Sequence, residues 1–313
     1  MSVSGFVSYR DRLVEACSQA IVGKKDEITL IAVCYLCGGH ILLEDVPGTG
    51  KTMLFRAFAK AAGGSFKRIQ FTPDVMPSDV TGIHFYNLKT AEFEFRPGPV
   101  FADLVLADEI NRATPRTQSS LLEAMAERQV SVDGETHPLA ETFMVAATQN
   151  PIESYGTFPL PEAQMDRFMM RLKLGYMQRG EEIGVALRRD TNDIIAGIGP
   201  VISEEETLRL REKLESIEIS EPVMHYIMDI VDKTRNDSHF NIGASPRGTI
   251  ALVRTSRAYA AFQGRSYVTP DDVKYLAPYV LAHRLHYRTA AFSAEAGTIF
   301  AEMLDKIPVP TER

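Results

Sequence analysis

Short apolar runs recur along the first half of the chain, with longer amphipathic stretches between them. The runs lie at residues 41–43, 69–71, 104–107, 143–147 and 170–174. Continuous apolar runs of this length are typical of strands that are buried on both faces of a parallel sheet, with crossover helices between them. The pattern therefore predicts an α/β domain built on a parallel sheet.

Helix signals replace strand signals after residue 176. Ser245 and Thr269 each stand directly before a proline, which is the order expected at a helix start. Because proline lacks an amide hydrogen, we expect Pro278 to end the helix that begins after Thr269. The second part of the chain is therefore predicted to be a small all-helical domain.

A glycine-rich turn follows the first predicted strand. Residues 45–52 read Asp-Val-Pro-Gly-Thr-Gly-Lys-Thr, which is close to the Walker A pattern. Glycines let backbone N–H groups surround phosphates, Lys51 would neutralise the β- and γ-phosphates of ATP, and the Thr52 hydroxyl would bind Mg²⁺. Asp45 stands where the general pattern has glycine, so a chance Gly-Lys-Thr turn is the alternative. The nucleotide-binding residues expected in this segment are Pro47, Gly48, Thr49, Gly50, Lys51, Thr52 and Met53.

A second acidic motif ends the apolar run at 104–107. Asp108 and Glu109 follow it directly, 57 residues after Lys51. Asp108 at a strand end can hold Mg²⁺, and Glu109 can act as general base toward the attacking water. Two acids after a strand alone would more often begin a solvated loop. Together with the glycine-rich turn, they indicate a P-loop nucleotide hydrolase.

Five segments of the chain resemble the signatures of the MoxR family of AAA+ ATPases. They are residues 42–52, 107–113, 147–151, 160–168 and 243–247. The resemblance runs from about residue 21 to 286, and Asp45 is compatible with it. It implies an AAA+ core at 1–176, with a five-stranded parallel sheet between helices, and an all-helical lid at 177–313.

The resemblance also implies roles for single residues outside the two motifs. Asn150 matches sensor 1, which orients the attacking water, and Arg247 matches sensor 2. Arg167 matches the arginine finger that reaches the γ-phosphate bound by the adjacent subunit. Arg171 and Arg112 are rival candidates for that role.

Three further features depend on the family pattern for their interpretation. The segment Ile21, Val22 and Gly23 resembles the one that contacts adenine, although an apolar turn before a helix is nearly as good a description. Val130 to Val132 followed by Asp133-Gly134 is a strong hairpin signal. By resemblance, about 129–141 is the pre-sensor-1 hairpin and about 82–97 is the helix-2 insert.

Composition narrows the choice of partners. The formal net charge is -7, and basic residues occur at most in pairs, so the basic stripe of a nucleic-acid-binding protein is not visible and nucleic acid is an unlikely partner. The longest apolar run is too short to span a bilayer, which favours a cytoplasmic protein. Cys34 and Cys37 have metal-site spacing but stand in an apolar stretch without partner ligands, so we interpret them as buried structural residues.

The main hypothesis is an enzyme that hydrolyses ATP with Mg²⁺ at subunit interfaces of a ring, a hexamer by resemblance. Members of the family assist maturation of, or metal insertion into, a client protein, often with a partner that carries a von Willebrand factor A domain. One alternative is a nucleotide-dependent scaffold with little turnover. Another is a chelatase-like motor subunit.

Overall fold

The computed structural model describes residues 3–45, 48–149, 156–187 and 191–310. The chain divides by its internal contacts into two compact units. The sheet unit comprises Asp11–Leu160 and Leu172–Leu208, and the helical unit comprises Met1–Arg10, Pro161–Arg171 and Arg209–Arg313. Within the described ranges, no helix is both long enough and apolar enough to cross a membrane.

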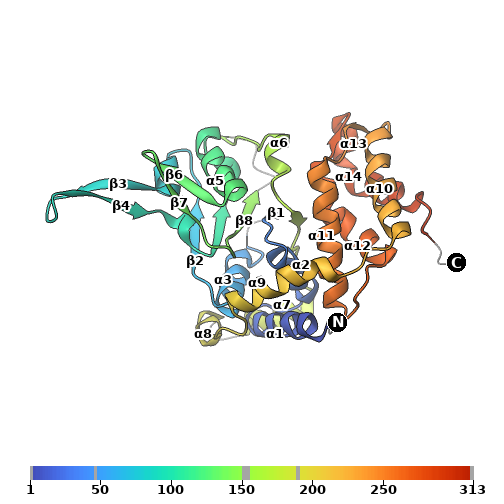
Figure 1. Ribbon diagram of the computed structural model, residues 1–313, viewed down its shortest axis with the longest axis horizontal. Coiled ribbons are helices and arrows are strands. Elements are labelled where there is room, and N and C mark those ends of the chain that lie inside the picture. The colour runs from blue at the N-terminus through green and yellow to red at the C-terminus, as the bar shows by residue number, and fades with distance from the viewer. Residues whose placement is uncertain (1–2, 46–47, 150–155, 188–190, 311–313) are drawn as a thin grey trace. The chain divides into compact units, whose positions relative to one another are not determined.

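The sheet unit is built on one five-stranded sheet with the order β2–β5–β8–β1–β9 (Figure 1). The strands span Phe66–Gln70 (β2), Leu104–Asp108 (β5), Met144–Gln149 (β8), Ile41–Glu44 (β1) and Met170–Leu172 (β9). β2 pairs with β5, β5 with β8 and β8 with β1, all in parallel. The α/β fold predicted from the apolar runs is confirmed, because each run coincides with or overlaps one of these strands.

Helices connect and flank the strands of the sheet unit. They are α1 (Ser4–Ala20), α2 (Lys25–Leu36), α3 (Lys51–Ala61), α4 (Pro77–Thr81), α5 (Pro115–Glu127), α7 (Arg179–Ala186), α8 (Thr191–Gly197), α9 (Glu204–Lys213) and the short 3-10 turns η1 (Pro99–Phe101) and η2 (Ile110–Arg112). α1, α9 and β9 each have residues on both sides of the division between the two units. Cys34 lies in α2 and Cys37 directly follows that helix; both side chains are buried and neither forms a disulfide, as the sequence interpretation expected.

Two antiparallel ribbons leave the parallel sheet. β3 (Gly82–Asn87) pairs with β4 (Glu92–Pro97), and β6 (Gln129–Val132) pairs with β7 (Glu135–Pro138) (Figure 1). The turn of the second ribbon has positive φ at both central residues, 51° at Asp133 and 87° at Gly134. These values fit a type I′ turn, which matches the twist of the flanking strands. The hairpin predicted from the Asp-Gly signal is confirmed.

The helical unit contains helices and one very short sheet. Its elements are α6 (Glu162–Met165), η3 (Leu214–Ser216), α10 (Glu221–Asn236), α11 (Pro246–Phe262), α12 (Pro270–Leu281), η4 (Ala282–Arg284), α13 (Ala290–Ala294), α14 (Ala296–Asp305), and the strands β10 (Phe240–Ile242) and β11 (His286–Tyr287). Ser245 and Thr269 cap α11 and α12, as predicted. The two short strands were not predicted, because two or three residues carry no periodicity.

The prediction that Pro278 ends a helix is wrong. α12 continues through Pro278 to Leu281. The buried residues Val273, Leu276, Val280 and Leu281 lie on both sides of the proline along one face. Their packing outweighs the roughly 3 kcal/mol that proline costs in a helix interior.

A buried histidine ties the sheet to α5 in the sheet unit. His40 precedes β1, and its Nε2 lies 3.1 Å from the carbonyl of Met125, while the Val145 amide donates to its Nδ1 at 3.0 Å. Burial lowers the pKa of His40 to about 4, and the nearby charge of Arg128 acts in the same direction. The ring is therefore neutral in the folded protein at neutral pH, as its two hydrogen bonds require.

This histidine makes stability depend on pH. The unfolded chain takes up a proton on His40 near pH 6.5, whereas the folded protein does so only near pH 4. The contribution of neutral His40 to the free energy of unfolding is therefore complete above pH 6.5, and it is lost as the pH falls toward 4. His40→Gln can still donate to Met125 but has no group that titrates. We predict that, when the pH is lowered from 7.5 to 5, the free energy of unfolding falls by roughly 2 kcal/mol less in His40→Gln than in the parent.

Denaturant unfolding followed by circular dichroism at several pH values measures the difference. His225 is the matched control, because its side chain is 73% exposed, and His225→Gln should keep the parent's pH dependence. Equal pH slopes for His40→Gln and the parent would contradict the assignment.

Candidate nucleotide-binding site

The glycine-rich turn joins β1 to the N-terminus of α3. Gly48 and Gly50 adopt φ angles of 86° and 85°, a region that only glycine enters without strain. A Cβ added at either glycine would meet no atom within 4 Å among the described residues, so the backbone there is open to a ligand. α3 begins at Lys51, and the amide groups of its first turn make the helix end favourable for an anion.

Asp45, which breaks the general Walker A pattern, is buried and has a structural role. Its Oδ2 accepts hydrogen bonds from the amides of Leu174, at 3.1 Å, and Gly175, at 3.0 Å. Its carbonyl accepts from Lys51 Nζ at 3.0 Å. The aspartate therefore connects the end of β1 to the segment after β9, and it holds the lysine beside the turn.

Asp108 lies at the carboxyl end of β5 between two neighbouring strands. Thr148 on β8 donates to its Oδ1 at 2.6 Å. On the other side, Arg68 on β2 donates to its Oδ2 through both Nε, at 3.1 Å, and NH2, at 2.6 Å. Thr148 and Asp108 meet because neighbouring parallel strands end at the same edge of the sheet. Arg68 lies opposite Leu106, two residues earlier, and reaches Asp108 with its long side chain.

Glu109 follows with a left-handed backbone, φ 57° and ψ 47°, which is sparsely populated for a residue other than glycine. Its amide donates to Thr148 Oγ1 at 2.8 Å. Its Oε2 accepts from Gln70 Nε2 and pairs with Arg112 Nε, both at 3.0 Å. Strain of this kind persists only where surrounding contacts hold it, and it is concentrated at functional sites.

These groups share one pocket of about 350 Å³. It is lined by Asp45, Gly48, Gly50, Lys51, Thr52, Met53, Arg68, Asp108, Glu109, Thr148 and Gln149. The structure thus brings together the main residues of both sequence motifs. Pro47 and Asn150 lie outside the described residues. Ile21, Val22 and Gly23 lie between α1 and α2 and are not part of the pocket lining that the described residues form.

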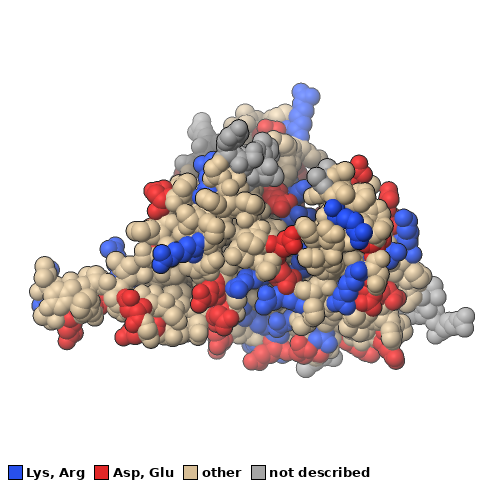
Figure 2. Space-filling view, turned by 90° about the horizontal axis from the view of Figure 1, so that it is seen from above, with Lys and Arg blue, Asp and Glu red and all other residues tan. Residues whose placement is uncertain are grey.

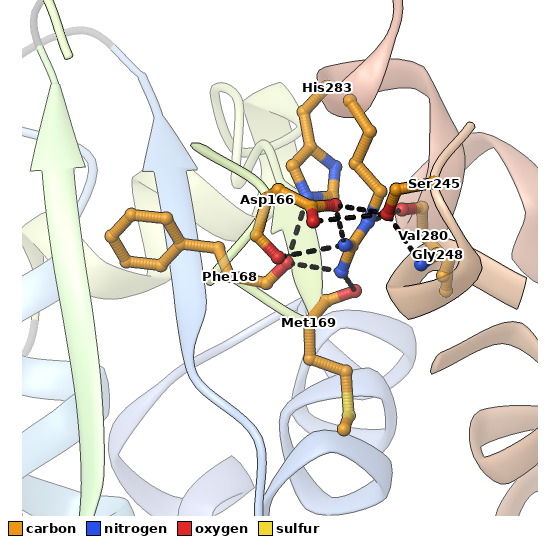
Figure 3. A network of polar contacts seen from close by, with 8 residues as sticks. Asp166, Phe168, Met169, Ser245, Gly248, Val280 and His283 are labelled. Atoms are coloured by element: carbon orange, nitrogen blue, oxygen red, sulfur yellow. Dashed lines mark hydrogen bonds and ion pairs between the residues drawn. The ribbon is translucent and has the colours of Figure 1, made fainter. Parts of the chain in front are cut away.

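Arg167 and Arg247 belong to the helical unit. A polar network there holds the backbone beside Arg167 (Figure 3). Arg284, with only 2% of its side chain exposed, pairs with the Asp166 carboxylate and also donates to the carbonyls of Asp166, at 2.8 Å, and Phe168, at 2.6 Å. Ser245, the N-cap of α11, donates to both Asp166 oxygens at 3.0 Å, with Arg247 exposed in the first turn of that helix.

Comparisons with known proteins agree with this geometry. Residues 40–170 match the family model described as "ATPase family associated with various cellular activities (AAA)", and residues 232–303 match the AAA lid domain. Over 289 residues the chain is 39% identical to "Chaperone MoxR1" of Mycobacterium tuberculosis, covering 88% of this chain and 75% of the relative.

The chain belongs to the MoxR family of AAA+ ATPases.

Two further relatives extend the match to nearly the whole chain. "Uncharacterized protein YeaC" of Bacillus subtilis is 48% identical over 304 residues, which is 96% of this chain and 95% of that protein. The crystal structure of a candidate ATPase from Cytophaga hutchinsonii superimposes with a TM-score of 0.90 at 37% identity and covers 98% of both chains. This MoxR-family protein is therefore an ATPase with a helical lid, and the pocket at the sheet edge is its candidate nucleotide site.

Sequence reasoning missed three residues that contact Asp108 or Glu109 in this MoxR-family protein, and it missed Arg284 in the helical unit. Arg68 and Gln70 alternate on β2, and Thr148 is the last residue but one of β8, so each was a polar residue in or directly beside a predicted strand. That position was the available signal, but pairing with Asp108 and Glu109 depends on strand order. Arg284 lies 117 residues after Arg167 in the chain, and nothing local in the sequence connects them.

Thr148 contacts both Asp108 and Glu109, so a substitution there tests whether the position of these acids matters for ATP hydrolysis. Thr148→Val keeps the shape of the side chain and removes its hydroxyl, which leaves the Glu109 amide without its acceptor. We predict a turnover number at least about tenfold lower in steady-state ATPase assays, because positioning errors at a reacting centre cost this much or more.

Thr142 is a matched control, because it is also buried and donates to Glu204 at 3.2 Å away from the pocket. Thr142→Val should lose comparable stability and keep parent turnover. The positioning role of Thr148 is wrong if Thr148→Val hydrolyses ATP as fast as the Thr142→Val protein.

Proposed function

We propose that this protein hydrolyses ATP·Mg²⁺ at the sheet-edge pocket, within a ring of identical subunits, to remodel a client protein. The observation that carries the proposal is that one pocket brings the Lys51 ammonium group together with the carboxylates of Asp108 and Glu109. A ligand that contains both phosphates and a divalent cation matches this combination. The lysine neutralises the phosphates, and a carboxylate binds the metal ion.

The phosphates of ATP are assigned to the turn and to the first residues of α3. Gly48 to Thr52 surround them with backbone amides, and Lys51 neutralises the β- and γ-phosphates in exchange for its present contact with the Asp45 carbonyl. The segment Ile21, Val22 and Gly23 is the proposed adenine contact, together with Met53 at the pocket wall.

Thr52 and Asp108 are the proposed Mg²⁺ residues. Both offer oxygen, the donor atom that Mg²⁺ prefers, and both line the pocket. When bound there, the ion neutralises charge on the phosphates. Asp108 must first release Arg68, whose side chain is 46% exposed. Only 14% of the Asp108 side chain is exposed, so the metal ion has to replace an ion pair that is half-buried.

Glu109 is the proposed general base. Gln70 and Arg112 hold its carboxylate now, and the exchange of these contacts for a water molecule would start hydrolysis. Asn150 is proposed to orient that water, and Arg247 to contact the γ-phosphate as sensor 2.

Two substitutions separate binding from hydrolysis. Glu109→Gln should keep parent affinity for a fluorescent ATP analogue and lose at least about 100-fold in turnover, because general bases contribute ~10²–10⁴ in rate. Lys51→Ala should lose most of the nucleotide affinity itself. Parent turnover in Glu109→Gln would overturn the base assignment, and slow turnover in the parent protein would favour the scaffold alternative.

Arg167 is the proposed finger that acts on the neighbouring subunit's nucleotide. Its backbone is held by Arg284 through Asp166 and Phe168. Arg112 is a weaker candidate, because its Nε already contacts Glu109 of the same chain. Arg171 is the remaining alternative.

A mixing experiment tests action between subunits. Arg167→Ala and Glu109→Gln proteins should each be nearly inactive, since a finger in trans contributes ~10³–10⁵ in rate. When they are mixed and reassembled, roughly one interface in four pairs an intact arginine with an intact glutamate, so about a quarter of parent ATPase activity should return.

In the control, Arg167→Ala protein is mixed with the double variant Arg167→Ala/Glu109→Gln. No subunit of this mixture has Arg167, so no interface can be restored. Absence of recovery in a demonstrated mixed ring would move the finger to Arg171 or Arg112.

The client is proposed to meet the β3–β4 ribbon. Tyr86, Leu88 and Phe93 expose 49%, 87% and 73% of their surface near its end, and that end is covered mainly by uncharged side chains (Figure 2). Exposed apolar clusters of this kind mark protein contacts. The name of the relative Chaperone MoxR1 supports a chaperone-like role. The cytoplasm is the proposed location. A partner with a von Willebrand factor A domain is part of the proposal, and co-elution of the purified pair tests it.

A further inference from the structure

A second cluster of potential ligands lies where the two ribbons meet. His84 is on β3 of the first ribbon, and Glu135 and His137 are on β7 of the second. Glu135 Oε2 is 3.5 Å from His84 Nε2 and 3.9 Å from His137 Nε2. One donor atom from each of the three residues lies within 4.8 Å of the other two.

Strand geometry explains why these residues converge. Glu135 and His137 are two residues apart on one strand, so their side chains point to the same face. The His137 ring stacks on Phe95 with centroids 4.0 Å apart and planes 6° apart. Phe95 pairs with His84 across the first ribbon. The aromatic contact therefore holds both imidazoles on the side that faces Glu135.

Two further contacts suit a metal site. His84 Nδ1 lies 3.1 Å from Asp133 Oδ2. When Nδ1–H donates to this carboxylate, the lone pair of Nε2 is left for a metal ion. His137 Nε2 is buried and has no hydrogen-bond partner among the described residues. An unused nitrogen beside a carboxylate and a second imidazole is the donor atom that a metal ion would satisfy.

We propose that His84 Nε2, His137 Nε2 and a Glu135 oxygen bind a divalent transition-metal ion, with Zn²⁺ as the expected occupant. Two imidazoles and one carboxylate suit Zn²⁺, whereas Mg²⁺ and Ca²⁺ prefer oxygen donors alone. Bonds of about 2.0–2.1 Å in a tetrahedral site separate the donors by roughly 3.4 Å. The two measured separations exceed that value by about half an ångström or less, so small side-chain movements close the site.

The bound ion would connect the two ribbons. Without it, the contacts described above between the ribbons are ring stacking and the polar contacts of His84 with Asp133 and Glu135, whose side chains are 72% and 68% exposed. Exposed pairs hold weakly. The ion therefore fixes the β3–β4 ribbon against the β6–β7 ribbon, independently of nucleotide chemistry.

Titration of the tag-free, EDTA-treated full chain tests the proposal. Mg²⁺ and ADP are added in excess to occupy the nucleotide pocket, and Zn²⁺ binding is measured by calorimetry. Co²⁺ serves as a spectroscopic probe, because its visible bands report a low-coordinate site. We expect one ion per chain, and at least about 100-fold weaker Zn²⁺ binding in His84→Ala and His137→Ala, since second-shell changes alone cost ~10–100-fold.

Two variants keep the test independent of folding. Glu135→Gln changes an exposed side chain and should also weaken Zn²⁺ binding, and Asp133→Asn should weaken it by about tenfold through His84. His225, an exposed histidine next to Glu221 on α10, is the matched control, so His225→Ala should bind Zn²⁺ like the parent. Absence of Zn²⁺ binding in the parent, or equal binding in Glu135→Gln and the parent, would overturn the proposal.

Discussion

The position of Asp108 between its two neighbouring strands is the contact on which the site depends. The interiors of β1, β5 and β8 are fully buried, so they admit almost only apolar side chains, and polar groups collect where the strands end. Parallel strands all end at one edge, and β1, β5 and β8 lie side by side there. The turn after β1, next to Lys51, and the two acids at the end of β5 therefore come together at this edge as a result of the strand order alone.

Every charged group described in this pocket already has a partner within the chain. Asp108 pairs with Arg68, Glu109 contacts Gln70 and Arg112, and Lys51 donates to a backbone carbonyl. In the proposed function, nucleotide binding at this pocket is an exchange of contacts rather than the filling of an uncompensated site. Because several of these contacts are partly exposed, each contributes little by itself, and a ligand with several charges can replace them together.

The sequence predicted those parts of the fold that depend on interactions between residues close together in the chain. Buried strands appear as apolar runs, and Asp133-Gly134 fits a turn that requires two positive φ angles. Pro278 was misjudged because packing of the surrounding face, which local pattern does not show, outweighs the cost of proline. Arg68 could not be assigned to Asp108 without the strand order, and Asp45 gave no sign of its contacts after β9. The histidines of the ribbons were equally invisible, because His84 and His137 are 53 residues apart.

The central claim is that ATP and Mg²⁺ bind at the carboxyl edge of the sheet by displacing the internal partners of the acids. A crystal structure with Mg²⁺ and a non-hydrolysable ATP analogue tests it most directly. The account predicts phosphates beside Lys51, a metal ion beside Thr52 and Asp108, and Arg68 beyond hydrogen-bonding distance of Asp108. A bound nucleotide with the Arg68–Asp108 contact unchanged from 2.6 Å, or phosphates bound elsewhere, would contradict it.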